Sequence, residues 1–201
     1  MSSELILVVC AANVCRSPLA ELLLRRGLEG VPGIHAASAG TLAQDGARIC
    51  PLVTSWHDDE AWGAASTAHR SRRADAELLE QAELILVSSR DVRADVVLAA
   101  PEVRGRTYTL REAVHLGEEF DSASQPRHVG TVARYATHLD RARVVRGAVP
   151  ESHRRWWRPR RADGSDIADG HGQGRWVHRA ALTEVLGATT AVVRQLGGRL
   201  A

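Results

Sequence analysis

The sequence contains no lysine, so all 26 of its Lys and Arg side chains are arginine, and they nearly balance its 24 acidic side chains. The resulting formal charge of +2 excludes the uniform positive surface of a protein that binds polyanions over its whole area. Apolar runs are short, and none approaches the about 18 residues that a membrane span requires. The 201 residues are enough for one α/β domain with its own hydrophobic core.

Cysteine is also scarce. Cys10, Cys15 and Cys50 form no CxxC motif and no even set that could make a disulfide framework. Reduced thiols suit the cytoplasm, and the first four residues lead directly into an apolar run. We therefore expect a cytoplasmic protein without a signal peptide. We expect Cys50 to be a small buried hydrophobe rather than a third redox thiol.

The most informative stretch lies at residues 5–21 and reads LILVVCAANVCRSPLAE. Its first five residues are apolar and rich in β-branched side chains, which predicts a buried strand. Ser17 and Pro18 are typical of a helix start, with Ser17 as the N-cap. The residues between form a loop whose backbone N–H groups gather at the helix start and bind anions. A cysteine there, Cys10, is favoured as the thiolate, and Arg16 matches a phosphate with two hydrogen bonds.

This stretch resembles the phosphate loop of the low-molecular-weight protein tyrosine phosphatases, written C-x-G-N-x-C-R-S-P. The resemblance implies that Cys10 attacks phosphorus, that Arg16 binds the equatorial oxygens, and that the Ser17 hydroxyl stabilises the departing thiolate. Cys15 lies across the loop, and we expect it to pair reversibly with Cys10 under peroxide. The implied phosphate-binding residues are Ala11, Ala12, Asn13, Val14, Cys15, Arg16 and Ser17.

Two further segments resemble the same family. Ser38 begins an S-A-G-T sequence after a second predicted strand, and the resemblance implies that it supports the loop by bracing Asn13. Asn13 tolerates the left-handed backbone that such a loop needs. His69 lies in a segment similar to the family's A-H-x-A-R, which implies that it belongs to the same hydrogen-bond network. An ordinary turn serine and a surface histidine stay open as alternatives.

A catalytic acid is expected at residues 166–172, where the family carries D-x-x-D-P. Asp169 matches the family's general acid, which protonates the leaving group and then activates water against phosphocysteine. Asp166 is the second candidate, and both acids could instead cap the last helix. Gly170 replaces the family's proline, so we expect a more mobile acid loop. Ala12 replaces the loop glycine, which would strain the loop if that position needs a positive φ.

Apolar runs alternate with helical patterns, which predicts an α/β fold: a three-layer sandwich with a four-stranded parallel sheet flanked by helices. Ligands bind at the carboxyl ends of the strands in such sheets, and Cys10 falls at one of them. We expect a single domain over residues 1–201, with an enlarged helical and loop segment at about 117–164. The predicted strands are 5–9, 34–39, 82–87 and 106–110, and the main predicted helices are 18–27, 75–81, 90–99, 129–145 and 173–196.

The stretch from Arg154 to Arg161, RRWWRPRR, is basic and aromatic and too polar for a core strand. It could be a solvated loop, a rim that selects an acidic or aromatic substrate, or a patch for nucleic acid or a membrane surface. One short cluster in a nearly neutral chain is weak support for the last of these. We therefore expect no nucleic-acid and no membrane partner.

Together these features predict a cysteine-dependent phosphatase that acts through a phosphocysteine intermediate, with protein phosphotyrosine as the expected substrate. No cofactor and no metal site are expected. A small phosphomonoester as substrate, an arsenate reductase that uses an external thiol, and a non-catalytic phosphate-binding module stay open. The presence of Cys10, Arg16 and Asp169 argues against the last. The sequence does not indicate the oligomeric state.

Overall fold

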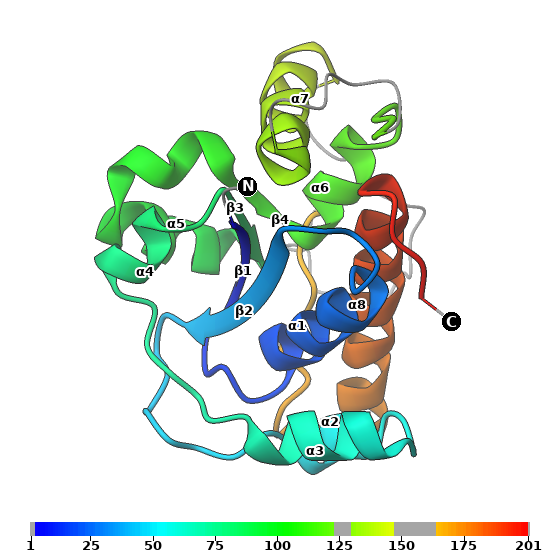
Figure 1. Ribbon diagram of the computed structural model, residues 1–201. Helices are drawn as coiled ribbons and strands as arrows, with labels where there is room; N and C mark the ends of the chain where they lie inside the picture. The colour runs from blue at the N-terminus through cyan, green and yellow to red at the C-terminus, as the bar shows by residue number, and fades with distance from the viewer. Residues whose placement is uncertain (1–2, 123–129, 147–163, 201) are drawn as a thin grey trace.

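The computed structural model describes residues 3–122, 130–146 and 164–200 (Figure 1). The Arg154–Arg161 stretch lies outside the described residues, as does much of the enlarged segment. Four parallel strands form one sheet in the order β2-β1-β3-β4, which confirms the predicted α/β fold. The strands are β1 (Glu4–Cys10), β2 (Ile34–Gly40), β3 (Leu84–Val87) and β4 (Thr107–Thr109).

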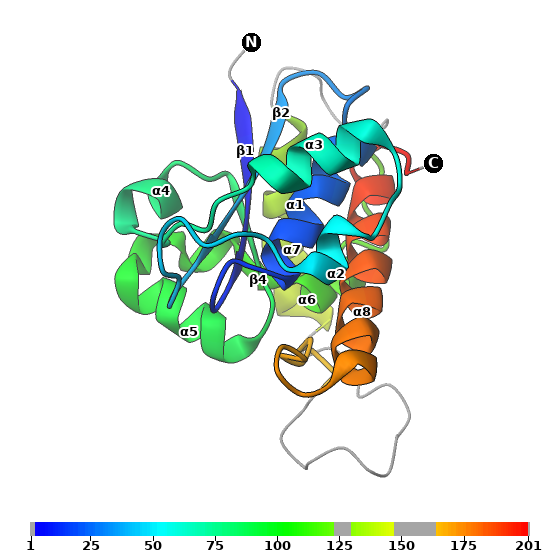
Figure 2. The same ribbon diagram turned by 90° about the horizontal axis from the view of Figure 1, so that it is seen from below.

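Helices cover both faces of the sheet. Figures 1 and 2 show α4 and α5 on one side, and α1, α6 and α8 on the other. Helix α8 contacts α1 and α6, and α7 contacts α6. The short helices α2 and α3 contact each other, and α3 also contacts α1 (Figure 2). The bounds are α1 (Arg16–Gly27), α2 (Pro51–Thr54), α3 (Glu60–Ala68), α4 (Ala76–Glu80), α5 (Arg90–Ala99), the 3₁₀ helix η1 (Pro101–Arg106), α6 (Leu110–Leu116), α7 (Thr131–Arg146) and α8 (Arg175–Gln195).

Two apolar cores result, one on each face of the sheet. Successive side chains of a strand point to opposite faces, so β1 sends Ile6 and Val8 toward α1 and α8, and Leu7 and Val9 toward α4 and α5. Both faces are buried, which explains why β1 reads as an unbroken apolar run rather than an alternating one. None of the helices in the described ranges has the length and apolar character needed to cross a bilayer.

The topology brings three distant segments to the carboxyl edge of the sheet. β1 ends at Cys10, whose carbonyl accepts a hydrogen bond from Thr41 N, just after β2, at 3.0 Å. The end of β3 lies alongside, since Ser88 N donates to Val9 O at 3.0 Å. Ile167 N, almost eighty residues further along the chain, donates to Ser88 O at 2.9 Å. The segment that carries Asp166 and Asp169, the predicted acid segment, is thereby held at the same edge as residues 10–17, the predicted phosphate loop.

Candidate active site

Cys10 is buried at the end of β1, and its sulfur has two hydrogen-bonding neighbours. The backbone N–H of Asn13 donates to Cys10 Sγ at 3.3 Å, and Ser17 Oγ lies 3.0 Å from the same sulfur. Both groups can donate to a negative charge carried by the sulfur. This is the environment that a thiolate nucleophile requires.

The Ser17 hydroxyl serves the site rather than the helix end, so its predicted N-cap role is wrong. Helix α1 begins at Arg16, with Cys15 as the N-cap and no side-chain cap hydrogen bond. Ser17 Oγ lies 3.2 Å from Ala39 O as well as beside Cys10 Sγ. A hydroxyl has one hydrogen, so it donates either to the carbonyl or to the sulfur. It can therefore accept from a Cys10 thiol and turn to donate to a thiolate.

Asn13 is the buried centre of the loop. It is the one non-glycine residue among those described that has a positive φ, at 55°. Its side-chain nitrogen donates to Ser17 Oγ at 3.0 Å and to Ser38 Oγ at 2.8 Å, while its side-chain oxygen accepts from Arg72 N at 3.0 Å. Both amide hydrogens and the oxygen are thus used, which offsets the cost of the left-handed backbone. Ala12 does not have a positive φ, so the expected strain at that position is absent.

Ser38 and His69 both lie against Asn13, and their supporting role stays a prediction. Ser38 Oγ donates to Glu21 Oε2 at 2.5 Å, and His69 Nε2 lies 3.0 Å from Asn13 O. The carboxylate of Glu21 is buried and also lies 3.9 Å from His69 Nδ1. Sequence reasoning gave Glu21 no part in this network. An acid near the start of a helix is common, and the burial of Glu21, the sixth residue of α1, depends on β2 and on the residues after α3.

Arg16 joins the phosphate loop to the acid segment. Its guanidinium is buried, and Nη1 donates to Ser88 Oγ at 3.3 Å and to Ile167 O at 3.2 Å. Nη2 donates to Asp169 Oδ2 at 2.6 Å. Three hydrogen bonds therefore orient the guanidinium of Arg16 at the carboxyl end of β3.

Of the two candidate acids, Asp169 is the one that contacts Arg16. Its side chain is half exposed, and its Oδ1 accepts from His171 N at 3.0 Å. Asp166 instead accepts from Arg90 N at 2.8 Å, at the start of α5. Asp166 thus binds the first backbone N–H of α5, whereas Asp169 is half exposed beside the Arg16 guanidinium, with one carboxylate oxygen on Arg16 and the other on His171 N.

Cys15 lies in the loop, but its sulfur contacts residues outside it. Cys15 Sγ is 3.1 Å from His171 Nδ1, and all three cysteines of the chain are free thiols. Interaction with the neighbouring Cys15 thiol lowers the pKa of Cys50, and the same interaction, together with burial, raises the pKa of Cys15. The pair therefore loses one proton far more readily than two. Cys50 is buried as expected, but its sulfur has polar neighbours and is not merely a hydrophobe.

Gly40 fixes the shape of the loop from the neighbouring strand. A Cβ at this position would lie 2.4 Å from Ala11 O and 2.9 Å from Asn13 N, both backbone atoms.

We expect Gly40→Ala to lower kcat/KM at least about tenfold, because displacements near 1 Å at a reacting centre can cost more than that. Initial rates on an aryl phosphate would measure the loss. Gly30→Ala, where a Cβ meets nothing within 4 Å, is the matched control, and equal activity of the two variants would contradict this role.

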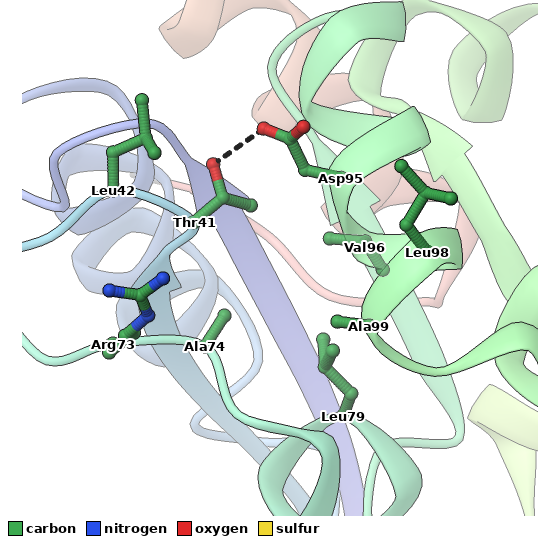
Figure 3. Close-up of a pocket in the computed structure, with 9 residues that line it drawn as sticks. All are labelled: Thr41, Leu42, Arg73, Ala74, Leu79, Asp95, Val96, Leu98 and Ala99. Carbon is green, nitrogen blue, oxygen red and sulfur yellow. Dashed lines mark hydrogen bonds between the residues drawn. The ribbon is translucent and has the colours of Figure 1, made fainter.

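A cavity of about 380 Å³ opens beside the site, between the segment after β2 and helices α4 and α5 (Figure 3). Thr41 Oγ1 donates to Asp95 Oδ2 at 3.0 Å across it. Exposed apolar side chains of Leu42 and Leu98 stand at its rim. None of the candidate catalytic side chains lines this cavity, so it is a neighbour of the site and not the site itself.

Comparison with known proteins gives a consistent result. Residues 5–142 match the family model described as low molecular weight phosphotyrosine protein phosphatase. The low molecular weight protein-tyrosine-phosphatase Ptp of Acinetobacter johnsonii is 35% identical over 114 residues, which are 55% of this chain and 74% of that protein. A protein-arginine-phosphatase of Geobacillus stearothermophilus is 32% identical over 112 residues, 54% of this chain and 70% of its own length.

The fold has solved counterparts as well. The crystal structure of the tyrosine phosphatase AmsI of Erwinia amylovora superposes with a TM-score of 0.61 at 22% identity, over 96% of this chain and 92% of that one. At this identity the likeness concerns the fold alone. The family match ends at residue 142, before Asp169, so the assignment of the acid depends on the contacts described above.

Proposed function

The chain belongs to the low molecular weight phosphotyrosine protein phosphatase family, and from this premise we propose that it hydrolyses phosphate monoesters through a covalent phosphocysteine on Cys10. One observation carries the proposal: the guanidinium of Arg16, in the same loop as Cys10, donates a hydrogen bond to the carboxylate of Asp169. A nucleophile, a fixed cation and an acid thus come together at the carboxyl edge of the sheet.

In the first step the phosphoryl group occupies the loop, and the Arg16 fork and the loop N–H groups bind its equatorial oxygens. In the structure Arg16 Nη2 donates to Asp169 Oδ2. The phosphate oxygens of a bound substrate would therefore compete with this carboxylate for the same donor. The Cys10 thiolate attacks phosphorus in line, the P–O bond to the leaving group breaks, and protonated Asp169 gives its proton to the departing oxygen. The products are phosphocysteine and the free alcohol or phenol.

In the second step Asp169, now a carboxylate, accepts a proton from water as the water oxygen attacks phosphorus. The S–P bond breaks, inorganic phosphate is released, and Cys10 leaves as the thiolate. The Ser17 hydroxyl, 3.0 Å from the sulfur, can turn from Ala39 O to donate to this new charge. Together the two steps return Cys10, Asp169 and Ser17 to their starting states.

We take protein phosphotyrosine as the substrate class, because the matching family model and the Acinetobacter relative both carry that description. Phosphoarginine in proteins is the second candidate, since a relative with 32% identity is described as a protein-arginine-phosphatase. In both cases Asp169 would protonate the leaving atom, an oxygen for tyrosine and a nitrogen for arginine.

Phosphate release from phosphotyrosine peptides, phosphoarginine peptides and small sugar phosphates tests this assignment. We expect the highest kcat/KM with phosphotyrosine, and we expect activity to persist in a metal chelator because the chemical steps use a thiolate and a carboxylic acid. Turnover of phosphoarginine alone would transfer the assignment to the second candidate. Arsenate-dependent thiol consumption without phosphate release from any ester would refute a phosphatase.

A further inference from the structure

Four potential metal ligands from four separate segments meet beside the phosphate loop. Cys15 comes from the loop itself, Cys50 is the N-cap of α2, His171 follows the acid segment, and His178 lies in the first turn of α8. One ligand atom from each lies within 4.8 Å of all the others. Two of these pairs are closer: Cys15 Sγ is 3.1 Å from His171 Nδ1, and Cys50 Sγ is 3.7 Å from His178 Nε2.

We propose that Cys15, Cys50, His171 and His178 bind one Zn²⁺ ion. Zinc prefers four tetrahedral ligands, and two thiolates with two imidazoles are a common set for a structural site. Zn–S bonds of about 2.3 Å and Zn–N bonds of about 2.0–2.1 Å place the ligand atoms roughly 3.3–3.8 Å apart. The separations of the four atoms, none above 4.8 Å, exceed this range by at most about 1.5 Å. Thiolate ligands disfavour Mg²⁺ and Ca²⁺, which prefer oxygen.

The surroundings hold most of the cluster in place and leave one side open. Both cysteines are buried at 5% exposure, and Cys50 N donates to Val14 O at 2.8 Å, which fixes α2 against the phosphate loop. His178 is also buried, while His171 is exposed and provides a route for the ion. The two imidazole rings lie 5.2 Å apart and nearly perpendicular, so they approach one region from different directions.

Gly170 permits the approach of the two histidines. A Cβ at this position would lie 2.5 Å from His178 Cα, 2.8 Å from His178 N and 2.8 Å from Val177 O. Those atoms are backbone and cannot move aside within a helix, so any other residue would push the acid segment away from α8. The glycine that replaces the proline of the resembled pattern thus brings His171 close to His178. Glycine in place of proline therefore allows a closer contact between the acid segment and α8, and not only the loop mobility that the sequence predicts.

The ion would connect the two halves of the candidate active site. Cys15 directly precedes Arg16, and His171 N donates to Asp169 Oδ1. A Zn²⁺ ion bound by both segments would hold the acid at a fixed place over the loop, and it would keep Cys15 from pairing with Cys10. This consequence rests on the proposed function, whereas binding of the ion does not.

The experiment uses the full chain as Cys10→Ser, so that the nucleophilic thiol cannot bind the metal. Reduced, metal-free protein is titrated with Co²⁺ and then with Zn²⁺. We expect one Co²⁺ per chain with the thiolate charge-transfer band and the visible bands of a tetrahedral site, and we expect displacement by one Zn²⁺. Adding His171→Ala or Cys50→Ser should weaken Zn²⁺ binding more than about tenfold. The exposed His35→Ala is the matched control and should bind as before.

Three results would overturn the proposal. They are absence of saturable binding in reduced protein, equal affinity in His171→Ala and His35→Ala, and binding that occurs only when Cys10 is present. His171 is exposed, so its replacement should not unfold the chain, and a thermal unfolding curve checks this. Hydrogen exchange of residues 164–174 should slow on Zn²⁺ addition in Cys10→Ser but not after His171→Ala. These readouts need no turnover, so they are independent of the success of the proposed function.

Discussion

Cys10→Ser is expected to lower kcat by roughly 10⁴-fold or more, because a hydroxyl is a far weaker nucleophile than a thiolate at neutral pH. The replacement is nearly isosteric, so Asn13 N and Ser17 Oγ keep an acceptor at the same place. The loop should therefore retain its shape. The loss is measured from initial rates of phosphate release from an aryl phosphate, after subtraction of the uncatalysed rate.

Binding of inorganic phosphate provides the control for this variant. Calorimetry should give an affinity for Cys10→Ser close to that of the unchanged protein, since Arg16 and the loop N–H groups remain. Loss of activity together with loss of phosphate binding would mean that the loop had collapsed. Substantial turnover by correctly folded Cys10→Ser would show that another group attacks phosphorus.

Asp169→Asn is expected to reduce kcat by about 10²–10⁴-fold, the usual range for loss of general acid–base catalysis. An amide can still accept the hydrogen bond from Arg16 at the Oδ2 position, but it cannot transfer a proton. The loss should be larger for phenyl phosphate than for an aryl phosphate with an activated leaving group, because a basic leaving group needs protonation most. A residue that only positions Arg16 would give the same loss for both substrates.

Asp166→Asn is the matched control for this second prediction. It makes the same chemical change three residues earlier, at a side chain that accepts a hydrogen bond from Arg90 N at the start of α5. We expect its activity to stay within a few fold of the unchanged protein, with no dependence on the leaving group. A large, leaving-group-dependent loss in Asp166→Asn, with Asp169→Asn nearly unaffected, would exchange the roles of the two acids.

Local signals explain why so much of the fold could be predicted. The apolar run of β1 and the strand-like patterns of β2, β3 and β4 mark the sheet, and α5 has the bounds that its sequence pattern indicates. The start of α1 could not be predicted in the same way. Ser17 has the chemistry of an N-cap, but its hydroxyl is drawn to Cys10 and Asn13, contacts that local propensity does not encode.

The contacts of the candidate site can likewise be divided into those that the local sequence indicates and those that depend on the tertiary structure. Cys10 and Arg16 lie six residues apart in one motif, so the sequence indicates their partnership directly. The contact between Arg16 and Asp169 spans 153 positions and depends on Ile167 reaching the end of β3. The approach of Cys15 to His171 spans 156 positions, and no spacing rule for metal ligands covers such a set. That cluster can be recognised only from the structure, in which α8 packs against the acid segment at Gly170.

The most direct test of the account is to identify the residue that carries phosphate during turnover. Asp169→Asn should be mixed with an activated aryl phosphate and quenched in acid, since slow hydrolysis of the intermediate lets it accumulate. Peptide mass spectrometry should then find one phosphoryl group on the sulfur of Cys10, formed in step with a stoichiometric burst of phenol. Phosphate on another residue, or a burst with no phosphoprotein, would contradict the account.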